Sequence, residues 1–84
     1  MHIVYILISE IDSNRIYIGL TQNLERRLQE HNKDSNDGYT KRYAPWKVET
    51  FITFNDNVLA QDFEKYLKSG SGFAFLKKRF ISNS

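Results

Sequence analysis

Hydrophobic residues in the first quarter of the chain fall in two short runs. Residues 2–9 are mostly apolar and β-branched, residues 15–20 form a second run of the same kind, and residues 10–14 between them favour a turn. Runs of this length with turn residues between them are typical of paired strands. The pattern therefore predicts an antiparallel hairpin at the start of the chain.

The next segment, residues 23–32, has the spacing of a helix. Asn23 is a favourable N-cap residue, because its side chain can accept a hydrogen bond from a free backbone N–H of the first turn. Leu24, Leu28 and His31 then recur on one side of the helix. We expect this side to face the sheet.

The middle of the chain predicts a polar loop followed by a third strand. The loop runs through Gly38 and ends at Pro45. Residues 46–54 then alternate between apolar and polar, which predicts a strand with Val48 and Ile52 on one face.

The last third of the chain contains two more segments with helical spacing. A helix capped by Asn57 is expected first, and a shorter helix runs from Phe73 to about Ile81. The sequence Ser-Gly-Ser-Gly at residues 69–72 predicts a stop between them. The apolar stripes expected to pack are Leu59, Phe63, Tyr66 and Leu67 in the first helix, and Phe73, Leu76 and Phe80 in the second.

The order strand, strand, helix, strand, helix, helix predicts an α+β fold, with a small three-stranded antiparallel sheet flanked by helices. The 84 residues suit one domain, residues 1–84. A domain of this size buries only about 60% of its unfolded-chain surface. The 40% hydrophobic content, with six Phe, five Tyr and one Trp, supplies one core and argues against disorder.

Two absences in the sequence narrow the chemistry. The chain has no cysteine, so disulfides and thiolate metal sites are excluded, and oxygen or imidazole ligands favour a hard cation such as Mg²⁺ or Mn²⁺. The longest N-terminal apolar run, residues 3–8, is too short to span a membrane and lacks the basic lead-in of a secretory signal. We expect a soluble cytoplasmic protein without a membrane partner.

Positive charge is unevenly distributed, although the net charge is only +2. No acidic residue follows Glu64, and a smaller basic group surrounds Tyr43 and Trp46. Such clusters attract phosphate, but taken alone they are equally compatible with solvated helix faces. The cations concerned are Lys65, Lys68, Lys77, Lys78 and Arg79 after Glu64, and Lys41, Arg42 and Lys47 in the smaller group.

Two tyrosines occupy the predicted hairpin, within Val4-Tyr5-Ile6 and Tyr17-Ile18-Gly19. If paired residues have an even index sum, Tyr5 and Tyr17 share one face, and Gly19 lies opposite or nearly opposite Tyr5. The missing side chain of Gly19 then leaves a gap where a substrate backbone approaches. An odd sum separates the two phenols. Tyrosines are also ordinary strand residues, and the hairpin alone favours that simpler interpretation.

Three further side chains bring catalytic chemistry. Arg27 and His31 are one helical turn apart, and Glu64 lies at the rim of an apolar helix face. The planar guanidinium of Arg27 suits a phosphoryl group that gains charge during attack. The alternatives are a surface arginine, a hydrogen-bonded histidine at a helix end, and a surface ion pair between Glu64 and Lys68 at i+4.

The order and spacing of these motifs resemble the GIY-YIG nuclease family, with similarity across nearly the whole chain and to the N-terminal domain of excision-repair nucleases. The matching segments are the two tyrosine tripeptides, Leu20-Thr21, Glu25-Arg26-Arg27-Leu28, Glu30-His31-Asn32, Pro45-Trp46-Lys47 and Glu64-Lys65-Tyr66-Leu67-Lys68. The resemblance implies metal-dependent endonucleolytic hydrolysis of nucleic-acid phosphodiester bonds, on DNA or alternatively RNA. It further implies a structure-selective role in DNA repair.

The resemblance also implies roles for individual residues. Tyr17 activates water, Arg27 stabilises the developing charge, and Glu64 holds one Mg²⁺ or Mn²⁺ ion. Tyr5 and His31 position the participants. Expected substrate-positioning residues are Gly19, Lys68, Lys77, Lys78 and Arg79, with Tyr43 stacking on an unpaired base; Trp46 is expected in the core.

Two departures from the family pattern affect rate and substrate choice. Leu20 stands where excision-repair relatives have a lysine, and residues 65–82 contain no equivalent of an asparagine that often follows the metal-binding glutamate. Two other functions remain open, a non-cleaving nucleic-acid-binding module and a small protein-interaction domain. The chain shows no separate targeting domain, so site choice is expected to depend on DNA shape, a partner protein or a homodimer.

Overall fold

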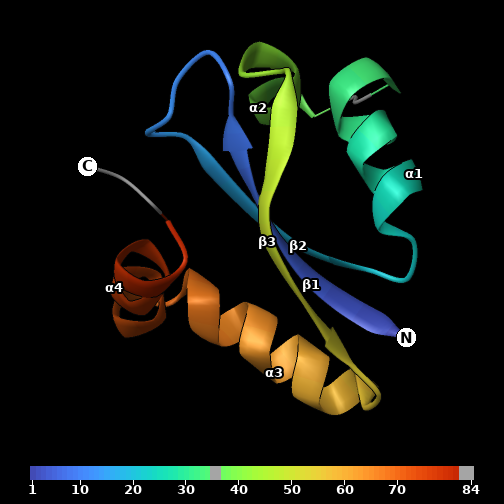
Figure 1. Cartoon of the computed structure of the whole chain (residues 1–84), viewed down its shortest axis with the longest axis vertical. Helices are drawn as coiled ribbons and strands as arrows, with labels where there is room; N and C mark the ends of the chain where they lie inside the picture. Colours follow the sequence, from blue (N-terminus) through green and yellow to red (C-terminus); the bar gives the residue numbers. More distant parts are fainter. Residues whose placement is uncertain (35–36, 82–84) are drawn as a thin grey trace.

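The computed structural model describes residues 1–34 and 37–81. Within them the chain forms a three-stranded antiparallel sheet of order β2-β1-β3 and four α-helices, which confirms the α+β prediction (Figure 1). The elements are β1 (His2–Ser9), β2 (Ile16–Thr21), α1 (Leu24–Gln29), the π-helical turn η1 (Glu30–Asp34), α2 (Gly38–Arg42), β3 (Trp46–Phe54), α3 (Asn57–Lys68) and α4 (Gly70–Arg79). None of the helices within the described ranges is long and apolar enough to cross a membrane.

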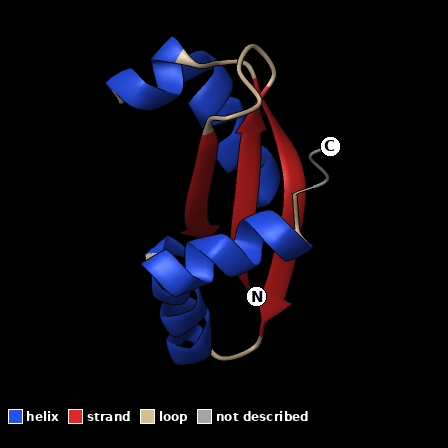
Figure 2. Ribbon diagram, turned by 90° about the vertical axis from the view of Figure 1, so that its left-hand side faces the viewer, coloured by secondary structure: helices blue, strands red, loops and turns tan. Residues whose placement is uncertain are grey.

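The central strand β1 is buried from both sides, because helices cover both faces of the sheet (Figures 1 and 2). Its even-numbered residues pack with α3 and α4, around Ala60, Leu67 and Leu76. Its odd-numbered residues Tyr5 and Leu7 pack with Trp46, Leu24 and Leu28 on the face that α1 covers. The sheet therefore separates two hydrophobic clusters, and Trp46, at 2% exposed, belongs to the core as expected.

The hairpin register follows the even-sum alternative. Tyr5 pairs with Gly19 and Leu7 pairs with Tyr17. Because paired residues point to the same face, Tyr5, Tyr17 and Gly19 all face α1. This confirms the shared face that the sequence left open.

The third strand corrects one prediction. A β-bulge between Ile6 and Leu7 shifts the register of β3, so that Ile52 pairs with Val4 while Val48 pairs with Leu7. Val48 and Ile52 therefore face opposite sides of the sheet, because a bulge inserts one extra residue and reverses the alternation.

The polar loop predicted through Gly38 contains a helix instead. α2 begins at Gly38, and the Asp37 side chain caps it by accepting a hydrogen bond from Tyr39 N. Within the helix, the Thr40 carbonyl accepts a hydrogen bond from Trp46 Nε1 at 2.8 Å. A helix of five residues is too short to give a clear periodic signal, so sequence spacing missed it.

The two C-terminal helices begin earlier than predicted. Asp56, rather than Asn57, caps α3 by accepting from Val58 N. Ser69 caps α4 by accepting from Gly72 N, so residues 70–72 open a helix instead of forming a stop. A Cβ on Gly72 would collide with the backbone of Tyr66, which explains why glycine occupies this close turn.

Two residues of the apolar stripe expected to pack on α3 lie outside the core, Tyr66 at 42% exposed and Leu59. Leu59 is 57% exposed, whereas its neighbour Ala60 is fully buried. α3 is therefore rotated by about one residue from the predicted stripe, because close packing on the sheet selects the small Ala60.

Candidate active site

The ring of Tyr5 lies across Gly19, its partner on the edge strand β2. A Cβ on Gly19 would lie 2.8 Å from Tyr5 Cε1 and still closer to the hydroxyl end of the ring. The absence of a side chain on Gly19 thus lets the Tyr5 hydroxyl extend over β2 toward the edge of the sheet. The predicted gap at Gly19 is filled by this phenol in the present structure.

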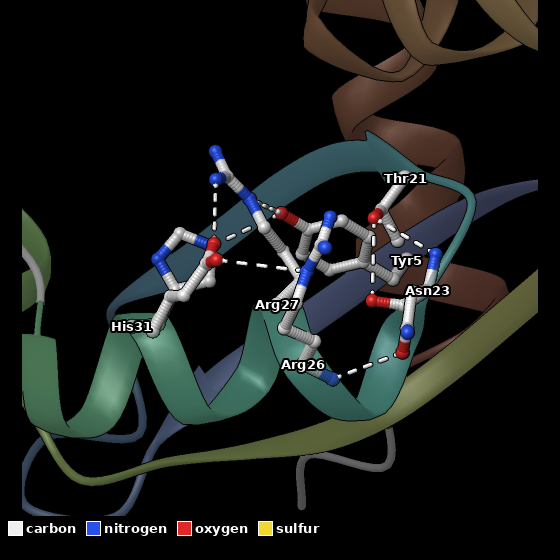
Figure 3. A network of polar contacts seen from close by, with 7 residues as sticks. Tyr5, Thr21, Asn23, Arg26, Arg27 and His31 are labelled. Carbon is white, nitrogen blue, oxygen red and sulfur yellow. Dashed lines mark hydrogen bonds and ion pairs between the residues drawn. The ribbon is translucent and has the colours of Figure 1, made fainter.

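The Tyr5 hydroxyl is the centre of a polar network (Figure 3). His31 Nε2 lies 3.0 Å from the hydroxyl oxygen, and Arg27 Nε donates to the same oxygen at 3.3 Å. With Arg27 as donor, the phenolic proton is free to point at a neutral His31. Arg27 also donates from Nη1 to Glu30 Oε1 at 3.0 Å, which completes the network.

The start of α1 fixes Arg27 above Tyr5. The Asn23 side chain accepts from Arg26 N at 3.1 Å, and its own backbone N–H donates to Thr21 Oγ1 at 3.1 Å (Figure 3). These hydrogen bonds determine the residue at which α1 begins after the end of β2. The predicted Asn23 cap is confirmed.

His31 lies in the π-helical turn and is only 5% exposed. The next residue, Asn32, ties this turn to β3, since Trp46 N donates to Asn32 Oδ1 at 2.6 Å and Asn32 Nδ2 donates to the Trp46 carbonyl at 3.1 Å. Sequence reasoning gave Asn32 no role, although it belonged to a matched segment. π-helical turns are frequent at functional sites, and this one orients the imidazole.

Tyr17 lies beside the same network without joining its hydrogen bonds. Its ring centroid is 4.5 Å from that of His31 and 6.3 Å from that of Tyr5. Within residues 1–34 and 37–81 the Tyr17 hydroxyl has no hydrogen-bond partner, whereas every buried polar side-chain atom there has one. The Tyr17 hydroxyl is therefore open to solvent and free to contact a water molecule.

Burial and charge shift the titration of the network. Burial raises the pKa of Tyr5, an effect that the Arg27 hydrogen bond opposes. Burial lowers the pKa of His31, and the nearby Arg27 cation lowers it further. Hydrogen bonds to Tyr5 and then to Glu30 raise the pKa of Arg27, which stays charged. At neutral pH the network therefore contains one cation, a neutral imidazole and a protonated Tyr5.

Glu64 projects from α3, which packs on the opposite face of the sheet alongside β2. Its side chain is 21% exposed and accepts an ion pair from Lys68 Nζ at 3.2 Å. The Glu64 carboxylate is also the last and smallest of the causes that raise the pKa of Tyr5, after burial and the charge of Tyr17. The i+4 ion pair expected as the simpler alternative is therefore present.

The donor set for a metal ion consists of one carboxylate. In the described part of the chain no three His, Asp or Glu side chains gather as a metal cluster. A single carboxylate completed by water and substrate phosphate suits Mg²⁺, which retains much of its hydration shell. Glu64 fits such an ion once Lys68 turns away, and the remaining ligands would come with the substrate.

The structure does not gather the other expected substrate contacts. Lys77, Lys78 and Arg79 lie on α4, across the sheet from α1 (Figure 1). Lys77 Nζ lies 5.4 Å from the Phe73 ring centroid. Tyr43 is half-buried, and the guanidinium groups of Arg15 and Arg42 lie over its ring, so that a base would have to displace them to stack there.

Comparison with known proteins finds a protein family whose model matches this chain. A family model described as the GIY-YIG catalytic domain matches residues 1–78. A structure-specific endonuclease subunit slx1 of Schizosaccharomyces japonicus is 42% identical over 64 residues, covering 71% of this chain but 23% of that protein. A UPF0213 protein of Clostridium perfringens is 38% identical over 68 residues, covering 81% of this chain and 71% of that protein. A UPF0213 protein of Pediococcus pentosaceus is 33% identical over 81 residues, covering 93% and 85%. The chain thus spans about a quarter of the slx1 protein and most of the UPF0213 proteins.

Proposed function

Because this chain belongs to the GIY-YIG family, we propose that it is an endonuclease that hydrolyses phosphodiester bonds of DNA. The observation that carries the proposal is the grouping of four side chains on the face of the sheet that α1 covers. The four are Tyr5, Tyr17, Arg27 and His31. Together these groups can accept a proton from water and stabilise a phosphoryl group under attack.

Tyr17 is the proposed acceptor of the proton from the attacking water. Its hydroxyl has no partner in the described chain, while its ring contacts that of His31. The Tyr5 hydroxyl is already engaged by Arg27 and His31, and Tyr5 is only 1% exposed. This arrangement favours a positioning role for Tyr5, which holds the guanidinium and the imidazole beside the reacting group.

Arg27 stabilises the charge that develops on the phosphoryl oxygens. Its Nε donates to Tyr5 and its Nη1 donates to Glu30, and the side chain is 44% exposed. An incoming phosphate therefore competes with Glu30 for one edge of the guanidinium fork. The Tyr5 contact fixes the other edge, so little side-chain entropy remains to be lost on binding.

Glu64 is the proposed ligand of one divalent cation, Mg²⁺ or Mn²⁺. Such an ion, when bound, supplies Lewis-acid stabilisation of the leaving oxygen. The contribution of the chain is the carboxylate, held on the rigid helix α3 and shielded in part from solvent. Lys68 forms an ion pair with this carboxylate in the structure. When Lys68 is released from the pair, its ammonium group becomes available for a substrate phosphate.

DNA is the proposed substrate and RNA the alternative. Two relatives carry the name structure-specific endonuclease subunit, which supports a preference for particular structures of the substrate, and a role in DNA repair stays a prediction from the sequence. The word subunit also supports targeting through a partner protein, with a homodimer as the alternative. A cytoplasmic location and phosphate contacts by Lys77, Lys78 and Arg79 complete the proposal as predictions from the sequence.

A cleavage assay tests the proposal against its two alternatives. Branched, nicked and single-stranded DNA would be incubated with the protein and Mg²⁺ or Mn²⁺, with Arg27→Ala and Glu64→Gln as test variants. Arg26→Ala and Glu25→Gln, on the exposed side of α1, are charge-matched controls. Metal-dependent cutting that is lost only in the test variants supports the nuclease. Binding without cutting would identify a non-cleaving module, and neither binding nor cutting would favour a protein-interaction domain.

A further inference from the structure

Two arginines pack against one tyrosine ring near the candidate site. Arg15 Cζ lies 4.7 Å from the centroid of the Tyr43 ring, and Arg42 Cζ lies 5.5 Å from it. Arg15 comes from the end of the β1–β2 hairpin and Arg42 from the end of α2. Cation–π contacts of this kind hold guanidinium groups in place while their N–H donors stay available. We name Arg15, Arg42 and Tyr43 the α2 patch.

The α2 patch lies on the same face of the sheet as the candidate site. A chain of aromatic contacts links the two: Tyr43 to Tyr39 at 5.1 Å, Tyr39 to Trp46 at 5.8 Å, Trp46 to Tyr17 at 6.3 Å, and Tyr17 to His31 at 4.5 Å between centroids. Tyr39 also donates to the carbonyl of Ile16, the residue before Tyr17, at 3.2 Å. These contacts connect the catalytic network to the patch through the buried Trp46, on one side of the sheet, whereas α4 lies on the other side (Figure 1).

The charge of the α2 patch is only partly compensated. Arg15 has an exposed ion pair with Asp12, at 3.4 Å, and such surface pairs are weak. Within the described residues Arg42 meets no carboxylate at ion-pair distance, and the neighbouring Lys41 is also exposed. Phosphate oxygens are the anions for which paired, oriented guanidinium groups are best suited.

We propose that Arg15 and Arg42 bind backbone phosphates of the nucleic-acid substrate beyond Tyr17, so that the substrate runs across the α1–α2 face. This inference rests on the proposed function and assigns the direction in which the substrate leaves the site. It gives Tyr43 a different role from the base stacking predicted from sequence. The ring of Tyr43 orients the two arginines, and the arginines contact the substrate.

The salt dependence of binding tests the α2 patch. Anisotropy of a labelled branched DNA would be measured in EDTA, to prevent metal-dependent cutting, for the wild type and for Arg15→Gln/Arg42→Gln. Each lost phosphate contact should reduce the slope of log K against log salt by about 0.9, so that the double variant binds roughly tenfold more weakly at moderate salt. Lys47→Gln/Lys65→Gln removes the same charge from exposed positions outside the patch and should keep the wild-type slope.

Two further variants separate the possible outcomes. Arg15→Lys/Arg42→Lys retains the charge and should recover most of the slope, and thermal melting checks that every variant folds. An unchanged slope in Arg15→Gln/Arg42→Gln, or an equal loss in Lys47→Gln/Lys65→Gln, would overturn the inference. A loss confined to Lys78→Gln/Arg79→Gln on α4 would overturn it as well. Cleavage by the wild type with Mg²⁺ is measured separately. An unchanged salt slope in the patch variant would therefore leave the nuclease proposal standing, and an absence of cleavage would leave the binding result interpretable.

Discussion

The hydroxyl of Tyr5 extends over strand β2 only because Gly19, the residue paired with it, has no side chain. We expect Gly19→Ala to force the Tyr5 ring aside, since the added Cβ would overlap the end of the ring that meets Arg27 and His31. Overpacking of this kind costs about 1–3 kcal/mol. Urea unfolding should show the loss, and cleavage should fall with it. Gly38→Ala is the matched control, because a Cβ there meets nothing within 4 Å.

The hairpin shows how far sequence reasoning could reach. If the residue numbers of each pair in the hairpin add to an even number, strand alternation puts Tyr5, Tyr17 and Gly19 on the same face. No residue type in the two strands determines whether that sum is even or odd. The pairing of Tyr5 with Gly19 depends on both hydrophobic clusters, since this register places Ile18 with Val4 and Ile6 on one side of the sheet and Tyr17 with Tyr5 and Leu7 on the other.

The two tyrosines should respond differently to removal of the hydroxyl. Tyr17→Phe should leave unfolding unchanged, because the hydroxyl has no partner in the described chain, while turnover falls by about 10²-fold or more if Tyr17 is the general base. Tyr5→Phe should lower stability by about 1–2 kcal/mol, because buried hydrogen bonds to Arg27 and His31 are lost. Single-turnover cleavage and urea unfolding measure the two effects. Full activity of Tyr17→Phe would transfer the base to another group.

Glu30 shares the guanidinium of Arg27 with the phenol and should weaken phosphate binding. Glu30→Gln removes this competitor, so KM for DNA should fall by about two- to fivefold with little change in kcat, in keeping with the modest strength of an exposed ion pair. Glu25→Gln, an equal charge change on the exposed side of α1, is the control. An equal fall in KM for both variants would indicate a general charge effect instead of a specific release of Arg27.

The sequence could not foresee the residues that hold Arg27 and His31 in place. Glu30 and Asn32 carry no chemistry that marks them, and their importance arises from the π-helical turn, which turns Asn32 toward Trp46 while Glu30 stays beside Arg27. The sequence also gives no signal for the bulge in β3. Glu49, the extra residue of the bulge, fits an alternating pattern as well as any other residue. Residue types predicted the chemistry, whereas irregular backbone positions it.

Lys68 has two competing interpretations that one variant can separate. If its role is to neutralise Glu64 until a cation binds, Lys68→Gln should lower the Mg²⁺ concentration needed for half-maximal cleavage. If Lys68 instead holds a substrate phosphate, as predicted from sequence, the same variant should raise KM for DNA and leave the Mg²⁺ requirement unchanged. Lys65→Gln, one turn away and exposed, is the control for net charge.

His31 should make both stability and cleavage sensitive to acid. Burial and Arg27 lower its pKa in the folded protein, so between that value and the unfolded value near 6.5 the folded state binds fewer protons than the unfolded state. Stability is therefore retained above pH 6.5 and is lost as the pH falls through this window. Urea unfolding at pH 7.5 and at pH 5 should show a larger loss for the wild type than for His31→Gln, with His2→Gln as the control. Cleavage should fall over the same range because a protonated His31 no longer accepts the Tyr5 hydrogen bond, and an identical acid response in wild type and His31→Gln would remove the imidazole from the network.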